Sequence, residues 1–457
     1  MKIEKPSIPK GTRDFGPDKM LKRQFILATI RKVFEKFGYQ PLETPAMENL
    51  TVLTGKYGAE GDQLLFKILN SGDFLSGVSA EDLQNGSKNL LPLIAEKGLR
   101  YDLTVPFARY VVMNQHEITF PFKRYQIQPV WRADRPQRGR YREFYQCDAD
   151  VVGSDALVCE AEIMLMIGEV MRNLGLDDYI IKVNNRKLLT AITDMVGEQG
   201  KEAALCVAID KLDKIGREKV EEELASNGFS AEAITKLNPV FGIKGSNLQI
   251  LDQLEQMLAH SVKGKEGIAE LRQVLGYLDD FGSSDPRLAL DITLARGLSY
   301  YTGTILEVRA NNSSINSSIT GGGRYDNLTS VFGLEGVSGV GFSFGVDRIY
   351  DVMEDLDIFP KTYEASTKVL LLNFDPGSFK HALMVLTKLR QADIKSEIYP
   401  DQAKIKKQMV YANKKEIPFV LMIGENEIKE GWYQLKNMVS GEQHKMELGE
   451  IIDLLSK

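Results

Sequence analysis

The sequence is poor in the residues that most often bind metals or act as nucleophiles. Its 457 residues include three cysteines and four histidines. The cysteines are far apart and form no CxxC pair, so neither a disulfide framework nor a zinc site is supported; they are Cys147, Cys159 and Cys206. No histidine stands near a plausible catalytic partner, which argues against a histidine-based triad; the four are His116, His260, His381 and His444.

The sequence also lacks a long apolar run. No segment approaches the ~18 apolar residues that a membrane-spanning helix needs, and the opening stretch MKIEKPSIPKGTRDFG has no apolar core like that of a signal peptide. A cytoplasmic location without membrane contact is the default expectation. The formal net charge of −6 argues against a protein that coats nucleic acid through a broadly basic surface. Any polyanion that the protein binds must therefore contact local patches of positive charge.

Apolar spacing divides the first part of the chain into helix and strand. Residues 20–37, MLKRQFILATIRKVFEKF, carry apolar side chains three and four apart and are followed by Gly38, which predicts an amphipathic helix. Residues 118–133 and 141–152 show alternating aromatic and aliphatic residues, which predicts two antiparallel strands joined by a long loop. A further helix is expected over 155–172 and a short buried strand over 180–184.

The rest of the chain indicates an insertion and a second domain. Residues 190–280 have almost only helical patterning, and strand signals resume after them, which predicts a helical domain inserted into one interrupted sheet. Residues 354–367 are polar and resemble a linker. Beyond them strands and helices alternate as βαβαβ and end in a pair of strands plus a helix, so residues 368–457 are expected to form a small α/β domain.

Positive charge is concentrated in the long loop. The stretch WRADRPQRGRYREF, residues 131–144, holds five arginines: Arg132, Arg135, Arg138, Arg140 and Arg142. A guanidinium fork suits the oxygens of phosphate or carboxylate, and a loop between strands can close over a bound anion. A solvated loop of surface arginines is the alternative. Phe144, just after the loop, either stacks on a base or fills core.

Three glycine-containing stretches also have ligand-binding character. LARGLSYYTGTILEV places Arg296 before two tyrosines, which either face a ligand or pack structurally. TGGGRYDNL allows close backbone approach to a ligand or forms a bulge, and no GxGxxG or P-loop pattern occurs. VGFSFGVDRIY opens a helix whose first turn carries Asp347 and Arg348, where a phosphate could bind or the arginine could simply be solvated. Together they favour electrostatic catalysis on phosphate.

In combination these stretches resemble the histidyl-tRNA synthetases, a family of class II aminoacyl-tRNA synthetases. GYQPLETPAMENL (38–50) resembles motif 1 with Pro45 as its proline, FKRYQIQPVWRADRPQRGRYREFYQCDAD (122–150) resembles motif 2, and GVGFSFGVDRIY (339–350) resembles motif 3. LARGLSYYTG and GGGRYDNL resemble the two signatures peculiar to the family. The resemblance extends over nearly the whole chain.

The resemblance implies an α+β fold: a six-stranded antiparallel class II sheet with flanking helices, a helical insertion and a C-terminal α/β anticodon-binding domain. The domains would be a catalytic domain at 1–185 and 281–355, interrupted by the insertion at 186–280, then a linker at 356–367 and the anticodon-binding domain at 368–457. Motif 1 would build a homodimer interface. The implied reaction activates histidine with ATP and Mg²⁺ to histidyl-adenylate and transfers it to the terminal ribose of tRNA(His).

The resemblance also assigns residues to the nucleotide. Arg132 matches the motif 2 arginine that holds the α-phosphate, and Arg348 the motif 3 arginine near the ATP phosphates. Arg296 matches the arginine placed where pentavalent charge develops, and a fixed guanidinium stabilises that charge without proton transfer. Phe144 matches the aromatic residue that stacks on adenine, and Glu143 would accept from the adenine amino group.

RYDLTVP (100–106) resembles the family's substrate loop, so that Asp102 and Thr104 would bind the α-ammonium group of histidine together with Gln146. Asp150 and Tyr301 match the pair that hydrogen-bonds the imidazole, which would exclude analogues lacking either ring nitrogen. The full set implied for histidine is Asp102, Leu103, Thr104, Gln146, Asp150, Tyr300 and Tyr301.

One position departs from the family pattern, because Ser299 stands where RGLDYY usually has Asp. The flanking arginine and tyrosines are intact, so activity is still expected. Two rival readings remain. One is a catalytically inactive paralogue such as the synthetase-like regulatory subunit of ATP phosphoribosyltransferase; the other is an ATP-dependent carboxylate-activating enzyme without a tRNA partner. The C-terminal domain and the signature arginine region argue against the first, and the C-terminal domain argues against the second.

Overall fold

The computed structural model describes residues 5–209, 211–283, 285, 287–295, 300–315, 318–360 and 367–456, with the side chains of 59, 60, 213 and 214 left aside. The chain divides into two compact units. The first comprises Met1–Arg13 and Ile26–Ile358, and the second comprises Asp14–Phe25 and Phe359–Lys457. Each unit is described separately.

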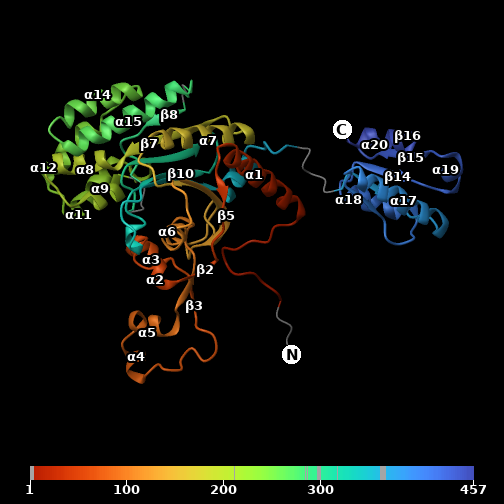
Figure 1. The fold of residues 1–457 in the computed structure, drawn as a ribbon, viewed down its shortest axis with the longest axis horizontal. Coiled ribbons are helices and arrows are strands. Elements are labelled where there is room, and N and C mark those ends of the chain that lie inside the picture. The colour runs from red at the N-terminus through yellow and green to blue at the C-terminus, as the bar shows by residue number, and fades with distance from the viewer. Residues whose placement is uncertain are drawn as a thin grey trace. The chain divides into compact units, whose positions relative to one another are not determined.

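The first unit is built on an eight-stranded sheet (Figure 1). Its six central strands are antiparallel to their neighbours and follow the order β5 (Phe122–Trp131), β6 (Glu143–Val152), β11 (Gly339–Gly345), β10 (Thr320–Tyr325), β9 (Thr304–Ala310) and β7 (Tyr179–Asn185). This confirms the predicted six-stranded antiparallel sheet. A short parallel strand is added at each edge, β1 (Gln40–Pro41) beside β5 and β8 (Leu288–Leu290) beside β7.

One face of this sheet is covered by helices. Successive side chains of β11 point to opposite faces of the sheet, and Phe342 and Phe344 share the face covered by α1 (Pro17–Lys36). Their ring centroids lie 5.9 and 6.1 Å from that of Phe34 in α1. Helix α7 (Val158–Leu174) contributes eleven buried residues, including Met166 and Ile167. It ends at Gly175, which has a left-handed conformation with a φ of 74°, as a helix C-cap commonly requires. The helices expected near 20–37 and 155–172 are therefore present.

A smaller three-stranded sheet precedes residues 100–106. Its order is β2 (Met47–Asn49), β4 (Lys97–Leu99) and β3 (Lys67–Ile68). Short helices accompany it: α2 (Leu50–Leu53), α3 (Gly58–Gln63), α4 (Ala80–Gln84) and α5 (Ser87–Ile94). In Figure 1, α4 and α5 lie at the far end of the β3–β4 projection. Helix α6 (Thr104–Met113) then leads into β5.

Between β7 and β8 the chain forms a group of helices, drawn in yellow-green to green in Figure 1. They pack through apolar side chains such as Leu188, Leu254 and Leu271, which are at most 2% exposed. Asn185 caps α8 by accepting from the backbone N–H of Lys187. The helices are α8 (Arg186–Met195), α9 (Glu202–Ile209), α10 (Leu212–Ile215), α11 (Arg217–Ser226), α12 (Ala231–Lys236), α13 (Asn238–Phe241), α14 (Asn247–Met257) and α15 (Val262–Asp280).

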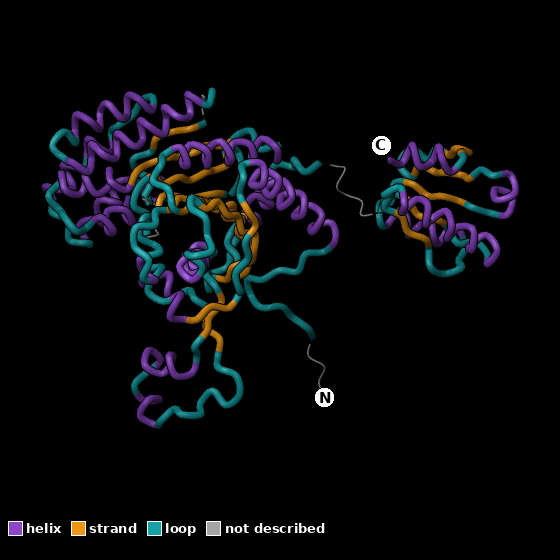
Figure 2. The backbone as a smooth tube through the Cα atoms, in the orientation of Figure 1, coloured by secondary structure: helices purple, strands orange, loops and turns teal. Residues whose placement is uncertain are grey.

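After β10 come the 3₁₀ helix η1 (Ser330–Phe332), β11 and α16 (Val346–Asp355), which closes the first unit. The second unit has a five-stranded sheet, visible in Figure 2 as adjacent strands. Its elements are β12 (Val369–Leu371), α17 (Pro376–Gln391), β13 (Ser396–Ile398), α18 (Ile405–Lys414), β14 (Phe419–Met422), α19 (Glu425–Glu430), β15 (Tyr433–Asn437), β16 (Gln443–Met446) and α20 (Leu448–Ser456).

The second unit buries both faces of its sheet. Val369 and Leu371 share a core with residues of α17 and α20, while Leu370 packs with Ala412 of α18 on the other face. Since β12 is parallel to both β13 and β14, each connection must cross over, and α17 and α18 provide those crossovers. The predicted βαβαβ pattern and the predicted closing pair of strands with a helix are all present.

Candidate active site

The face of the large sheet opposite α1 and α7 carries a ladder of polar side chains. In β6, Cys147, Ala149 and Val151 are at most 1% exposed on the helix-covered face, so the alternate residues Gln146, Asp148 and Asp150 point to the other face. The strand register pairs these three with polar residues of β5 and with small residues of β11; the partners are Gln128, Gln126 and Arg124 in β5, and Gly345, Ser343 and Gly341 in β11.

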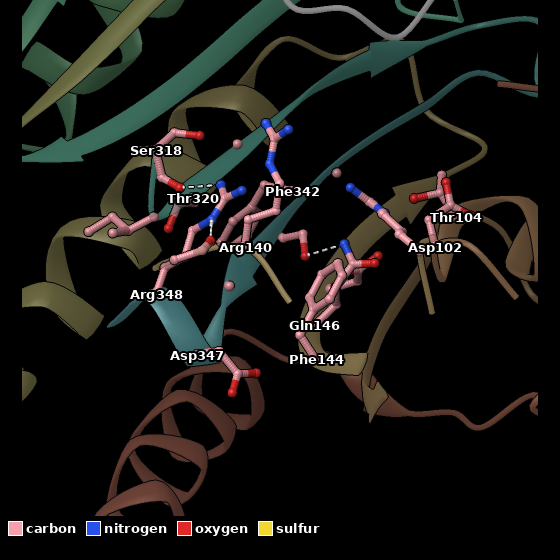
Figure 3. Close-up of a pocket in the computed structure, with 18 of the residues that line it drawn as sticks. Asp102, Thr104, Arg140, Phe144, Gln146, Ser318, Thr320, Phe342, Asp347 and Arg348 are labelled. Atoms are coloured by element: carbon pink, nitrogen blue, oxygen red, sulfur yellow. Dashed lines mark hydrogen bonds between the residues drawn. The ribbon is translucent and has the colours of Figure 1, made fainter. Parts of the chain in front are cut away.

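A pocket lies over this ladder, and its lining includes most of the residues implied for the two substrates (Figure 3). Arg348 and Ser318 lie at one side, Asp102 and Thr104 at the other, with Phe144 and Gln146 between them. Of the residues predicted from the sequence, the pocket brings together Arg132, Asp102, Thr104, Phe144, Gln146, Asp150, Tyr300, Tyr301 and Arg348.

Two predicted residues that the structure describes do not line the pocket. Leu103 precedes α6 and is fully buried in the core. Glu143 is exposed and accepts a hydrogen bond of 2.8 Å from the indole N–H of Trp131. Arg296 lies outside the described residues, as does Ser299.

The floor of the pocket is strongly acidic. Asp102, Asp148 and Asp150 are at most 3% exposed, and burial is the main cause that raises the pKa of each carboxyl group. The pKa of Asp148 rises to about 7. The buried cation that faces them is Arg124, whose Nη2 lies 2.8 Å from Oδ2 of Asp150. Arg124 lowers the pKa of Asp148 and of Asp150, and Arg132 lowers that of Asp102, so these two guanidinium groups offset the effect of burial only in part.

Several acceptor atoms on this floor lack a partner among the described residues. They are Oδ2 of Asp102, Oε1 of Gln146 and Oδ1 of Asp148, all buried without a hydrogen bond. A buried acceptor without a partner is unfavourable by about 1–3 kcal/mol, so such atoms mark the places where a ligand's donors fit. An amino acid with an ammonium group and a donating side chain supplies donors of this kind.

Neighbouring groups fix the orientation of the acidic side chains. Oδ1 of Asp102 accepts from the hydroxyl of Tyr57 at 3.0 Å and from the backbone N–H of Val105 at 3.1 Å, so its other oxygen faces the pocket. Asp150 accepts from the hydroxyl of Tyr325 at 2.5 Å. At Gly341, opposite Asp150, a Cβ atom would collide with the Asp150 carboxylate, so glycine is required for space.

The aromatic wall of the pocket is formed by the segment that follows residues 296–299. The rings of Tyr300 and Tyr301 have centroids 4.8 Å apart, and Tyr325 meets Tyr300 edge to face at 6.3 Å. Burial raises the pKa of Tyr300 and of Tyr325 well above the ordinary value, so both hydroxyls remain protonated donors. They can donate to an acceptor while packing against a flat ring.

Two arginines bring positive charge to the pocket, Arg132 near Asp102 and Arg348 in the first turn of α16. The guanidinium of Arg132 lies 4.2 Å from the centroid of Tyr101 and 5.2 Å from that of Phe144, and its Nε donates to the carbonyl of Tyr101 at 3.1 Å. Arg348 donates through Nε to the carbonyl of Gly139 at 3.0 Å and through Nη1 to that of Ser318 at 2.7 Å. Both guanidinium groups therefore line the pocket while hydrogen bonds to backbone carbonyls hold them in place.

The other loop arginines are used differently. Arg138 pairs with Asp355 at 2.9 Å, and Arg140 lies 3.6 Å from Asp134. Arg142 donates to the carbonyl of Asp134 at 3.0 Å. Arg140 nevertheless lines the pocket. Gly139, between Arg138 and Arg140, has a φ of 74°, in the left-handed region. Much of the arginine-rich loop is therefore paired within the chain.

Some pocket residues were not selected from the sequence. Asp148 could have been found from its i, i+2 spacing to Gln146 and Asp150 on one face of a strand. Arg124 and Ser343 are placed by the register of β5 and β11, for which the sequence offers no direct signal. Within the described residues, no group of three or more His, Cys, Asp or Glu side chains is arranged to hold a metal ion. Nor does that part of the chain contain a helix long and apolar enough to cross a membrane.

The large unit has an antiparallel sheet with flanking helices, and its pocket is lined by carboxylates and two guanidinium groups. A C-terminal α/β unit follows. Together these features define a class II aminoacyl-tRNA synthetase. The family model for histidyl-tRNA synthetase matches residues 95–349, and that for an anticodon binding domain matches residues 368–457. The chain belongs to the histidyl-tRNA synthetase family.

Individual relatives extend this similarity along the full chain. The histidine–tRNA ligase of Cytophaga hutchinsonii is 60% identical over 453 residues, covering 99% of this chain and 100% of that protein. The histidine–tRNA ligase of Phocaeicola vulgatus is 56% identical and covers 98% of each chain. The crystal structure of histidyl-tRNA synthetase from Nostoc sp. PCC 7120 matches with a TM-score of 0.84 at 31% identity, covering 99% of both chains.

Proposed function

We propose that this chain is a histidine–tRNA ligase that activates histidine with ATP and transfers it to the 3′ end of tRNA(His). The family membership supports the reaction, and one observation in the pocket supports its location. Buried oxygens of Asp102, Gln146 and Asp148 that have no partner among the described residues line one pocket together with the Phe144 ring and the guanidinium groups of Arg132 and Arg348. That arrangement fits an amino acid and a nucleotide placed end to end.

At the acidic end, the ammonium group of histidine would bind Oδ2 of Asp102, with Thr104 and Gln146 beside it. The imidazole would lie between Asp150 and the tyrosine wall, donating one N–H to a carboxylate and accepting at its other nitrogen from Tyr301. An analogue that lacks either ring nitrogen would leave a buried polar group unpaired, which supports selection for histidine.

At the cationic end, adenine would stack on Phe144 with Glu143 at its amino group, and the phosphates would meet Arg132, Arg296 and Arg348. Mg²⁺ would enter with ATP, with phosphate oxygens of the nucleotide as its ligands. An oxygen of the histidine carboxylate attacks the α-phosphorus, and the bond to the leaving pyrophosphate breaks. Fixed guanidinium groups stabilise the charge that develops there, so the side chains need not transfer a proton in this step.

In the second step, a hydroxyl of the terminal tRNA ribose attacks the carbonyl carbon of histidyl-adenylate, and AMP leaves. We propose a catalytic domain at residues 1–185 and 281–355, an insertion at 186–280, a linker at 356–367 and an anticodon-binding domain at 368–457. A cytoplasmic homodimer built through residues 38–50 completes the proposal, resting on the resemblance of that segment to motif 1.

Histidine-dependent exchange of pyrophosphate into ATP tests the first step, and charging of tRNA(His) tests the second. Both activities are expected. Absence of exchange with histidine and Mg²⁺ would favour an inactive regulatory paralogue, and exchange without charging would favour an activating enzyme with no tRNA partner. Arg296→Ala should lower adenylate formation by roughly 10² or more, as loss of an oxyanion-type donor does. Near-normal exchange would remove Arg296 from this role.

Removal of residues 368–457 separates the two functions further. If the C-terminal domain binds the anticodon, the truncated chain should lose tRNA charging far more than pyrophosphate exchange. Equal losses would mean that the domain mainly supports folding or dimerisation.

A further inference from the structure

The N-terminal segment before α1 packs on the phosphate end of the pocket. The backbone N–H of Arg142 donates to the carbonyl of Gly11 at 2.9 Å, and Nη1 of Arg142 donates to the carbonyl of Lys10 at 3.4 Å. Gly11 has a φ of +89°, and a Cβ atom there would lie 2.8 Å from side-chain carbons of Arg142 and Pro136. The segment therefore packs closely against the arginine-rich loop. Arg13 follows two residues after Gly11.

Arg13 meets two elements of the pocket at once. Its guanidinium stacks on Tyr141 with the central carbon 3.2 Å from the ring centroid, and Nη2 pairs with Oδ1 of Asp347 in the first turn of α16. Nη1 lies 4.0 Å from Asp351, one turn further along that helix. Tyr141 itself donates from its hydroxyl to Asp351 at 2.7 Å. Arg13 thus joins the loop to α16.

The charge of Asp347 explains why this contact matters for ATP. Asp347 lines the pocket, its side chain is 3% exposed, and it is the immediate neighbour of Arg348. A buried carboxylate at the phosphate end would repel ATP and offset the attraction of the guanidinium beside it. Its second oxygen accepts from the backbone N–H of Tyr145 at 3.0 Å, a neutral donor that leaves the charge in place. Arg13 supplies the opposite charge.

We propose that Arg13 is a positioning residue for ATP. By pairing with Asp347 it keeps that carboxylate from cancelling Arg348, and by stacking on Tyr141 it holds the arginine-rich loop against α16. This inference rests on the proposed function, and it adds a residue outside the three motifs and the two family signatures. Arg13 acts through Asp347 and Tyr141 and need not touch a substrate.

The test is pyrophosphate exchange by the full-length enzyme, with ATP and histidine varied separately. Arg13→Ala should raise the KM for ATP by about tenfold, the equilibrium effect of losing a charge-assisted hydrogen bond, and leave the KM for histidine within about twofold. Arg13→Lys keeps the charge without the planar stacking, so it should give an intermediate KM for ATP. Lys10→Ala removes an exposed positive charge from the same segment and should behave as wild type.

The double variant Arg13→Ala/Asp347→Asn isolates the electrostatic part. Removing the negative charge of Asp347 as well should return the KM for ATP to within about threefold of wild type. An unchanged KM for ATP in Arg13→Ala, or equal rises for ATP and histidine, would overturn the proposal, and so would a double variant no better than the single one. Absence of exchange by the wild-type enzyme is a separate result, which would refute the proposed function instead.

Discussion

Replacement of Asp148 by asparagine tests the acidity of the pocket floor. Asp148 is 2% exposed, and burial raises the pKa of its carboxyl group from 3.8 to about 7. The groups facing it come from four elements: Arg124 on β5 and a hydrogen bond from Ser343 on β11 lower this pKa, while Asp150 on β6 and Asp102 before α6 raise it. Asparagine keeps the shape of the side chain and removes the titration.

The sign of the pH dependence follows from the raised pKa. The folded protein holds the Asp148 proton more tightly than the unfolded chain does, so the stabilisation is complete below about pH 4 and is lost as the pH rises through about 7. Between about pH 5.5 and about pH 8 the free energy of unfolding of the wild-type protein should fall by roughly 2 kcal/mol through this group, because each pH unit over which only the folded state holds the proton corresponds to about 1.4 kcal/mol. Asp148→Asn should not show this loss.

Thermal melting of both proteins without ligand, at the two pH values, measures the difference. The melting temperature of wild type relative to Asp148→Asn should fall by about 3 °C on going to the higher pH. Asp155→Asn, an exposed acid just beyond the same strand, is the matched control and should follow wild type. Parallel pH curves for wild type and Asp148→Asn would refute the reasoning that a buried, protonated Asp148 forms part of the floor.

Three further substitutions address the pocket and its support. Gly341→Ala should raise the KM for histidine at least about tenfold, because its methyl group would displace the Asp150 carboxylate. Tyr325→Phe removes the 2.5 Å hydrogen bond to Asp150 and should raise the same KM by about tenfold, with a smaller effect on the KM for ATP. Glu160→Ala leaves the buried guanidinium of Arg324 without its carboxylate partner, 2.5 Å away, and should destabilise the protein by about 3–5 kcal/mol in denaturant unfolding. Glu162→Ala, which removes a partly exposed 2.7 Å pair with Lys123, is the control for this loss and should cost less than about 1 kcal/mol.

Different results would contradict each of these expectations. A KM for histidine that is unchanged in Gly341→Ala or Tyr325→Phe would separate Asp150 from histidine binding. Equal stability losses in Glu160→Ala and Glu162→Ala would show that burial of the first pair does not matter.

The helices and strands of the large sheet followed from local patterning, because each buries one face. The antiparallel pair at 118–133 and 141–152 was predicted from alternation and is present as β5 and β6. The eight-stranded sheet with parallel edge strands was not predicted, since β1 has two residues and β8 has three, too short to show a period. Strand order likewise depends on contacts far apart in the chain.

The residues of the pocket were likewise predictable from the sequence only in part. The motifs selected residues such as Arg132, Asp102 and Arg348 because their types and spacing match a chemistry, and the pocket lining includes all three. The sequence did not indicate Arg124, whose place beside Asp150 comes from the register of two strands. It also gave no reason to connect Arg13 with Asp347, 334 residues later.

The sequence by itself determined which residue types are available and which face of each element is apolar, since these depend on side chains within one or two turns of each other. It also determined the family, through motifs whose order is fixed along the chain. Only the tertiary structure decided the environment of each charge: that Asp148 is buried with a raised pKa, that Arg138 and Arg142 are engaged within the chain, and that Arg13 faces Asp347. Burial and charge pairing depend on contacts made across the whole fold, and these set the electrostatics of the pocket.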